Sequence, residues 1–221
     1  MPAQKPLVAP PRLDPVRLPE LEPGDDTRLE PSATLEGLAF EGVVADAVEL
    51  GGARLESCRI AGLRAAEADL RGTTVRETLF EHLDIPVVRG ARTRWREVSF
   101  EGGRLGSAEL YDAEWQSVQF TGAKLGFLNL RGARLEDVRF TDCVIDELDL
   151  GSAAVERLAL PGVRIRHLDV TRATLRDVDL RGCAFEVLTG AGFLRGAVID
   201  TDQLALLAPV LASELGLTVA D

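Results

Sequence analysis

Every fifth residue from position 35 to position 185 is apolar or glycine, and no insertion shifts this frame. Of these 31 positions, 28 hold a large apolar side chain; the exceptions are Ala45, Ala65 and Gly90. A second register, two residues earlier in each group of five, holds only Ala, Val, Leu, Cys, Thr and Gly. A period of five matches neither a helix nor a flat strand. It fits a backbone that turns a corner after each short segment.

A longer period of 20 is superimposed on the period of five. Positions 40, 60, 80, 100, 120, 140, 160 and 180 read Phe, Ile, Phe, Phe, Phe, Phe, Leu and Leu, so five of the eight phenylalanines share one column. Four groups of five in each coil would place successive members of this column one strand spacing apart, about 4.8 Å. The sequence therefore predicts a coil with four sides and a stack of Phe rings.

The form of the repeat is clearest in Ala68-Asp69-Leu70-Arg71-Gly72 and Leu128-Asn129-Leu130-Arg131-Gly132. Over about residues 33 to 190 this pattern resembles that of the pentapeptide-repeat proteins. The resemblance implies an all-β solenoid, a right-handed quadrilateral parallel β-helix. At one strand spacing per coil, the groups of five would make about eight coils and a rod on the order of 38 Å long.

We expect three regions along the chain. These are a proline-rich N-terminal arm over residues 1–31, the β-helix over residues 32–198, and a short α-helical cap over residues 199–221. The arm holds eight of the eleven prolines, which excludes a helix or a central strand. We interpret it as an extended arm lying over the first coil; the alternative is a partner-binding polyproline segment.

The period of five ends near residue 199, where a helical pattern begins. Thr201 or Asp202 is a candidate N-cap, and Gly216 is a candidate C-terminal cap. Pro209 predicts a kink, or two short helices meeting near Ala208. The side chains expected to cover the last coil form one stripe: Leu204, Leu207, Leu211 and Leu215.

Three apolar residues of this segment lie off the capping stripe: Leu206, Val210 and Leu217. They need another cover, so we predict that they form a homodimer interface. In the pentapeptide-repeat proteins that the chain resembles, a C-terminal helical module commonly joins two rods tail to tail.

The repeat is most irregular over residues 84–96, where Pro86 removes an amide donor and Gly90 replaces a large inward residue. One interpretation is a distorted coil in which Trp95 and Trp115, one coil apart, widen the interior. The other is a basic docking patch with an aromatic side chain at its centre: Arg89, Arg92, Arg94, Trp95 and Arg96.

The pattern gives no catalytic set. His82 and His167 are the only histidines, and their outward positions about four coils apart argue against a catalytic triad or a histidine metal site. Cys143 and Cys183 lie two coils apart, roughly 10 Å, beyond the reach of a disulfide. No phosphate-binding glycine motif is present. We expect no enzyme activity, no cofactor and no metal.

Charge and hydropathy limit the possible partners. The chain has 25 basic and 36 acidic residues, a net charge of −11, which argues against direct nucleic-acid binding. Its longest apolar run, residues 204–212, is far shorter than the roughly 20 residues of a membrane span. We therefore expect a cytoplasmic protein.

Two binding functions remain. The first is a non-enzymatic scaffold that binds another protein. The second is implied by the resemblance: DNA mimicry, in which a rod occupies the DNA site of gyrase or a related topoisomerase and protects it from poisons. Duplex DNA carries about one charge per 1.7 Å, whereas residues 33–198 contain 26 acidic and 21 basic residues. The candidate anionic patches are Glu101, Glu109, Asp112 and Glu114, and Asp142, Asp146, Glu147 and Asp149.

Overall fold

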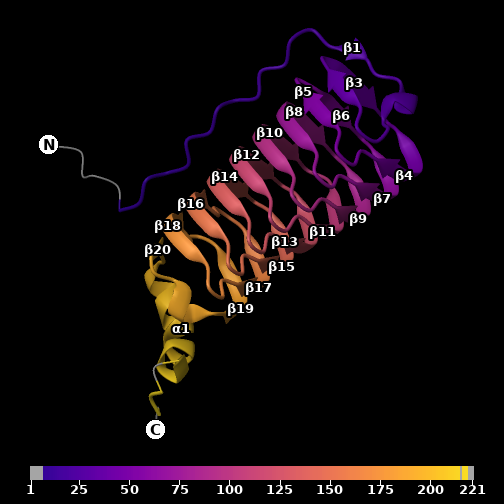
Figure 1. Cartoon of the computed structure of the whole chain (residues 1–221). Coiled ribbons are helices and arrows are strands. Elements are labelled where there is room, and N and C mark those ends of the chain that lie inside the picture. The colour runs from indigo at the N-terminus through magenta and orange to yellow at the C-terminus, as the bar shows by residue number, and fades with distance from the viewer. Residues whose placement is uncertain (1–6, 215, 219–221) are drawn as a thin grey trace, which may run out of the picture.

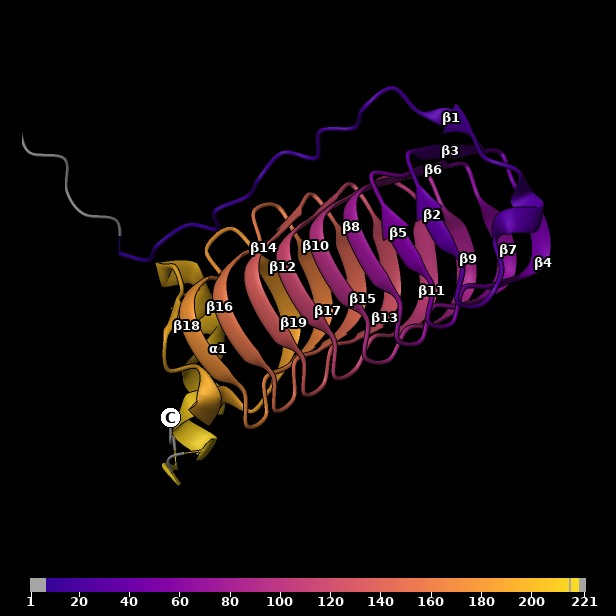
Figure 2. The ribbon, with the colours of Figure 1, turned by 45° about the horizontal axis from the view of Figure 1, so that its top comes forward.

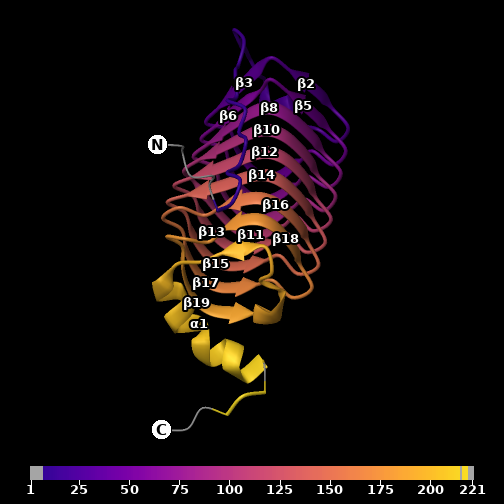
Figure 3. The same cartoon turned by 90° about the vertical axis from the view of Figure 1, so that its left-hand side faces the viewer.

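The chain folds into a parallel β-solenoid with one helix at its C-terminal end (Figure 1). A computed structural model describes residues 7–214 and 216–218. Two sheets run along the solenoid, and the coils are stacked as successive layers from β3 (Leu38–Glu41) at the top of Figure 3 to β19 (Ala184–Thr189) near its bottom. The solenoid has about nine turns, where eight were predicted. The difference arises at the ends, where two-residue strands extend the ladder beyond the strict repeats.

The larger sheet has 12 strands in the described part of the chain. They are β1 (Glu22–Pro23), β2 (Thr34–Glu36), β3 (Leu38–Glu41), β5 (Arg54–Glu56), β6 (Arg59–Ala61), β8 (Thr74–Glu81), β10 (Arg94–Glu101), β12 (Glu114–Thr121), β14 (Arg134–Thr141), β16 (Ala154–Ala159), β18 (Thr174–Asp179) and β20 (Ala197–Val198).

The second sheet has eight strands within the same described residues. They are β4 (Val44–Glu49), β7 (Arg64–Asp69), β9 (Asp84–Arg89), β11 (Arg104–Glu109), β13 (Lys124–Asn129), β15 (Val144–Asp149), β17 (Arg164–Asp169) and β19 (Ala184–Thr189). The helices are the 3-10 turns η1 (Asp26–Arg28) and η2 (Ala191–Phe193) and the α-helix α1 (Thr201–Glu214).

The strand register reproduces the period of 20 found in the sequence. From β2 to β19 each pairing is parallel and joins residues 20 apart, as in Trp95↔Trp115 and Phe100↔Phe120. The predicted Phe column is buried, and its rings are stacked from Phe100 to Phe140, with ring centroids of Phe120 and Phe140 4.9 Å apart. That distance is the spacing between strands, so identical side chains meet in successive coils.

Three of the four corners of the coil are made by a residue in the left-handed backbone conformation. Within the described residues these corners recur at positions 42 to 182, 32 to 172 and 37 to 177, in steps of 20. Glycine fills many of them, but 14 residues with side chains also have positive φ, among them Glu97 at 56° and Asp137 at 57°. The fourth corner, inside the strands of the second sheet, has no such residue there. Left-handed corners therefore set the four-sided shape.

The irregular segment is accommodated within the ladder. Pro86 lies in β9, which pairs with both of its neighbours. A Cβ atom at Gly90 would lie 2.5 Å from the Leu110 side chain, so Leu110 of the next coil fills that space. The Trp95 and Trp115 rings stack inside the solenoid, with centroids 4.8 Å apart and planes inclined by 4°.

The N-terminal arm runs along the length of the solenoid. It was expected over the first coil alone, but Figures 1 and 2 show it passing from the end near β18 to the opposite end, where β1 joins β3. Its amides find acceptors on side chains of distant coils, which explains the difference. The arm is thus an extended segment that lies across the coils.

Helix α1 covers the last coil by contacts that differ in part from the predicted stripe. Leu207 is buried and Leu211 packs against the core, but Leu204 is 51% exposed; Leu215 lies outside the described residues. Pro209 lies inside one continuous helix, so the prediction of two short helices was wrong. Gly216 has the expected left-handed φ of 71°.

The N-cap of α1 is Asp200 instead of Thr201 or Asp202. Its Oδ1 accepts from the Gln203 N–H at 2.9 Å, and Gln203 Oε1 accepts from the Asp200 N–H at 2.9 Å. This reciprocal capping box places the helix start one residue earlier than the sequence prediction. The C-terminal end is closed by bonds from Gly216 and Leu217 to Ser213 and Ala212, a Schellman arrangement.

Candidate interaction surfaces

A groove of about 630 Å³ runs along one side of the larger sheet. Its lining combines outward side chains of β8, β10, β12, β14, β16 and β18 with the buried residues between them: Val75, Trp95, Trp115, Leu135 and Val155. The lining residues repeat in steps of 20, so the groove follows the solenoid axis.

The charged walls of the groove differ between its two halves. Toward the N-terminal coils they hold Arg76, Arg94 and Arg96, and toward the C-terminal coils Arg134, Glu136, Glu156 and Arg176. Glu114 lies 3.6 Å from Arg94 and reduces the charge at the boundary. The surface therefore offers a basic half and a half of mixed charge to a single partner.

The structure divides the predicted docking patch at residues 89–96. Arg94 and Arg96 line the groove, whereas Arg89 pairs with Glu67 on the second sheet and Arg92 is an exposed corner residue. Trp95 is 4% exposed and stacked in the core, so it is not available as an aromatic contact. An inward position of the period of five accounts for its burial.

The predicted anionic clusters are dispersed or partly neutralised. Glu101, Glu109 and Asp112 lie on different segments of the coil, at the end of β10, the end of β11 and a corner. In the second cluster Asp149 is buried and 2.8 Å from Arg131, and Asp146 lies 3.7 Å from Arg166. Asp142 forms a left-handed corner, and Glu147 stands beside His167.

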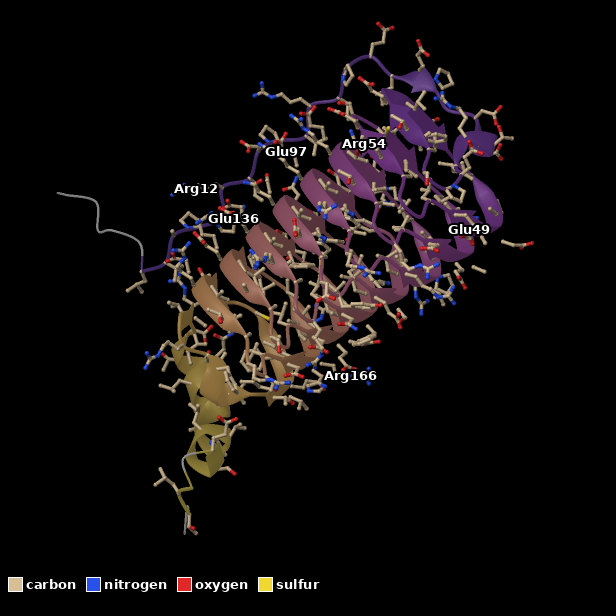
Figure 4. All side chains as sticks on the ribbon, viewed as in Figure 1. Arg12, Glu49, Arg54, Glu97, Glu136 and Arg166 are labelled. Carbon is tan, nitrogen blue, oxygen red and sulfur yellow. The ribbon has the colours of Figure 1, made fainter. Side chains whose placement is uncertain are left out.

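Figure 4 shows the distribution of side chains around the solenoid. Glu97 and Glu136 lie on the edge that the arm follows, with Glu136 beside Arg12, and Glu49 and Arg166 lie on the opposite edge. Neither edge carries carboxylates alone. This mixed pattern differs from a continuous anionic strip.

Several Asp residues and one Asn near the corners have a structural role. Their carboxylate or amide oxygen accepts a hydrogen bond from the main-chain N–H two residues later, an Asx turn. The residues are Asp69, Asn129, Asp149, Asp169 and Asp179. Bonding from Arg71 lowers the pKa of Asp69, although burial opposes the shift.

The C-terminal end presents apolar side chains without cover in the described monomer. Leu206 is 68% exposed and Leu217 is 62% exposed, while Val210 is half-buried. Leu204 of the same helix is also exposed. The three predicted interface residues are therefore wholly or partly available.

A second interaction surface, which the sequence analysis did not predict, lies under the arm. The corner residues Gly37, Ser57, Glu77, Glu97, Ser117, Asp137, Arg157 and Asp177 form one column, here called the arm column. Three arm amides donate to it: Ala9 to Asp177 Oδ1 at 3.0 Å, Arg12 to Asp137 Oδ1 at 2.7 Å, and Asp14 to Ser117 Oγ at 2.8 Å. The only sequence signal was the step of 20 between polar corner residues.

Arg157 connects the charged part of the arm column. Its Nε lies 2.6 Å from Asp137 Oδ1 and its Nη2 lies 2.5 Å from Glu136 Oε1, and Arg157 also pairs with Glu156. Burial raises the pKa of the Asp137 carboxyl, but hydrogen bonds from Arg157 and from the Arg12 amide outweigh it and hold the pKa below its ordinary value. The same bond to Asp137 raises the pKa of Arg157.

The cysteines are buried and unpaired with one another in the described residues. Burial raises the pKa of the Cys183 thiol to about 12 and that of Cys143 in the same direction. Such thiols pack as small apolar groups. The described residues contain no group of three or more His, Cys, Asp or Glu side chains that could hold a metal ion. Nor does any helix in that part of the chain have the length and apolarity to cross a membrane.

The structure has the fold of a pentapeptide-repeat β-solenoid. Its parallel strands are stacked with a 20-residue register, and small and large inward residues alternate. Asp or Asn side chains cap the corners. Residues 113–189 match the family model described as a pentapeptide repeat region. This confirms the resemblance stated from the sequence. None of the curated proteins compared matches the chain.

Among the solved structures that resemble the chain are a pentapeptide repeat protein and a fluoroquinolone resistance protein. One is HetL, a pentapeptide repeat protein involved in heterocyst differentiation regulation from the cyanobacterium Nostoc sp. strain PCC 7120. Its sequence is 17% identical to this chain. The match covers 78% of this chain and 91% of HetL, with a TM-score of 0.42. Full-length QnrB1, a plasmid-mediated fluoroquinolone resistance protein, is 14% identical, with 81% and 99% covered and a TM-score of 0.36.

Proposed function

We propose that the chain is a non-enzymatic scaffold that binds another protein through its outer surface. The observation that carries this proposal is the groove, in which Arg94 and Arg96 stand in a basic half and Glu136 and Glu156 alternate with Arg134 and Arg176 in a half of mixed charge. An uneven charge distribution along one groove favours a partner with a complementary charge order, and it sets the orientation of that partner.

The scaffold would function as a homodimer joined through α1. Leu206, Val210 and Leu217 support this part of the proposal, because a partner copy would remove their apolar surface from water. Two solenoids joined at their C-terminal ends would present two grooves to the same or to two partners.

DNA mimicry at gyrase or a related topoisomerase is the second candidate. The feature that favours it is the register position shared by Glu49, Asp69, Glu109, Asp149 and Asp169 at the ends of the second-sheet strands. Arg71 binds Asp69, and Arg131 binds Asp149 and Asp169, which lowers the net charge of this row. We therefore place mimicry after the scaffold function.

The scaffold proposal is tested by affinity capture with matched charge reversals. The tagged chain is expected to recover a protein in fixed stoichiometry from cells that produce it. Arg96→Glu, in the basic half of the groove, should abolish this capture. Arg172→Glu changes the same charge at an exposed corner outside the groove and should leave capture intact. Equal capture by both variants would contradict docking in the groove.

A further inference from the structure

The arm and the arm column match in their repeat distances. Asp177 and Asp137 lie two coils apart, about 9.6 Å at one strand spacing per coil. The arm residues bound to them, Ala9 and Arg12, are three residues apart, and three residues of polyproline II rise about 9.3 Å. One turn of a polyproline II segment therefore spans two coils.

The arm column contacts the arm mainly through the main chain of the arm. All three contacts use main-chain N–H donors, and the acceptors are two carboxylates and one hydroxyl of the column. Pro10, Pro11 and Pro15 next to these donors fix φ near the polyproline II value, which lowers the entropy lost on docking. The chain thus presents donors at spaced positions on a preformed extended backbone.

Apolar contacts complete the docking. Val8 and Pro11, three residues apart, are buried although they lie outside the solenoid core. Ser117 and Asp137, directly beneath the arm, are 4% and 5% exposed. Arg157 fills the coil between Asp137 and Asp177 and keeps the buried carboxylate of Asp137 paired. These burials define a binding track over the coils from Ser117 to Asp177.

We propose that the arm column is a recognition site for extended proline-rich segments, with residues 7–24 as its resident ligand. A segment of the same chemistry on a partner binds the column when the arm is released. The tethered arm is present at an effective concentration in the millimolar range, so it acts as an internal competitor. This makes the arm an inhibitory strap over a peptide-binding surface.

The test keeps the full chain and frees the arm after folding. A specific protease site is inserted between Asp25 and Asp26, in the exposed turn that follows the arm. A fluorescent peptide with the sequence of residues 7–24 is titrated with the chain before and after cleavage, and anisotropy reports binding. We expect saturable binding to the cleaved chain and at least tenfold weaker binding to the intact chain.

Matched glycine substitutions identify the site. Ser117→Gly and Asp177→Gly remove acceptors of the column, while glycine accepts the positive φ of these corners. Each should weaken peptide binding to the cleaved chain by about tenfold. Ser152→Gly and Asp112→Gly remove the same side chains from an exposed corner that the arm does not follow and should leave binding unchanged.

A peptide with Pro10, Pro11 and Pro15 replaced by alanine should bind more weakly, because its backbone is not preformed. The proposal is overturned if the cleaved chain does not bind the peptide. It is also overturned if the four glycine variants bind it equally well, or if the alanine peptide binds as well as the original. Circular dichroism of each variant verifies that the solenoid is folded.

Discussion

At the scale of single residues, the repeat Ala68-Asp69-Leu70-Arg71-Gly72 shows what each residue contributes to one corner of the coil. Ala68 and Leu70 point into the coil, and Asp69 bonds the Arg71 amide and guanidinium. Gly72 then takes the left-handed φ of 67°. The inward positions were predictable from the sequence because burial follows the period directly. The Asx turns were not, because a surface Asp has the same appearance in sequence whether it is solvated or bonded.

The backbone requirement at Gly72 can be isolated. A Cβ atom there would have no neighbour within 4 Å, so Gly72→Ala tests the left-handed φ alone. We expect a loss of about 1–2 kcal/mol in the free energy of unfolding. Gly72→Asn should lose less, because asparagine tolerates this conformation. Urea unfolding measures both; equal stability of all three proteins would contradict the assignment of the corner.

Acid should weaken the arm column through Asp137. Its pKa is depressed in the folded chain, so its stabilisation is present above the unfolded value near 3.9 and is lost as pH falls through the folded pKa. Asp137→Asn should therefore cost about 1–2 kcal/mol at pH 7, and the difference from the wild type should shrink below about pH 4. Urea unfolding between pH 7 and pH 3 measures this.

The exposed corner aspartate Asp112 provides the control for that series. Asp112→Asn should follow the wild type at every pH. If the free energy of unfolding of Asp137→Asn stays below that of the wild type by the same amount down to pH 3, the Arg157 pairing does not depend on the charge of Asp137.

At the scale of elements, helix α1 is attached by a polar anchor as well as by leucines. Gln203 is buried, and its Nε2 donates to the Leu180 and Cys183 carbonyls at 2.6 Å each. The same side chain closes the capping box with Asp200. The leucine stripe suggested a hydrophobic cap, but the amide contacts join residues 20 and 23 positions apart and leave no local pattern. For this reason the start of the helix was misplaced by sequence reasoning.

Removing that anchor should loosen the C-terminal end. Gln203→Met keeps the length of the side chain but leaves two buried carbonyls without their donor. We expect a loss of about 2–3 kcal/mol. Hydrogen exchange should show faster exchange in α1 and β19 and little change in the central coils, because each coil contacts only its neighbours. Uniformly faster exchange along the solenoid would contradict this anchoring role.

At the scale of the whole molecule, the solenoid could be predicted because one short period determines both the inward residues and the stacking. The course of the arm could not, because residues 7–21 have no apolar period and their acceptors lie more than 100 positions away. The groove is lined by outward side chains, and the period of five does not determine which residues occupy these outward positions. Thus the core was predictable, and the binding surfaces required the structure.

The proposed dimer makes a direct prediction about mass. Leu206→Glu places a charge in the apolar surface of α1 and should convert a dimer into a monomer in analytical ultracentrifugation. Val44→Glu alters a side chain of similar exposure, 74% against 68%, on β4 at the opposite end of the solenoid. It should leave the dimer intact. A monomeric wild type, or a dimeric Leu206→Glu variant, would contradict association through α1.

The central functional claim is that a surface of mixed charge binds a protein partner and does not imitate DNA. Supercoiling by gyrase, measured with increasing amounts of the purified chain and with or without a topoisomerase poison, tests it most directly. The claim predicts unchanged supercoiling and unchanged poisoning at concentrations well above that of the enzyme. Inhibition of supercoiling, or rescue from the poison, would contradict it and show that the partly neutralised acidic rows are sufficient for mimicry.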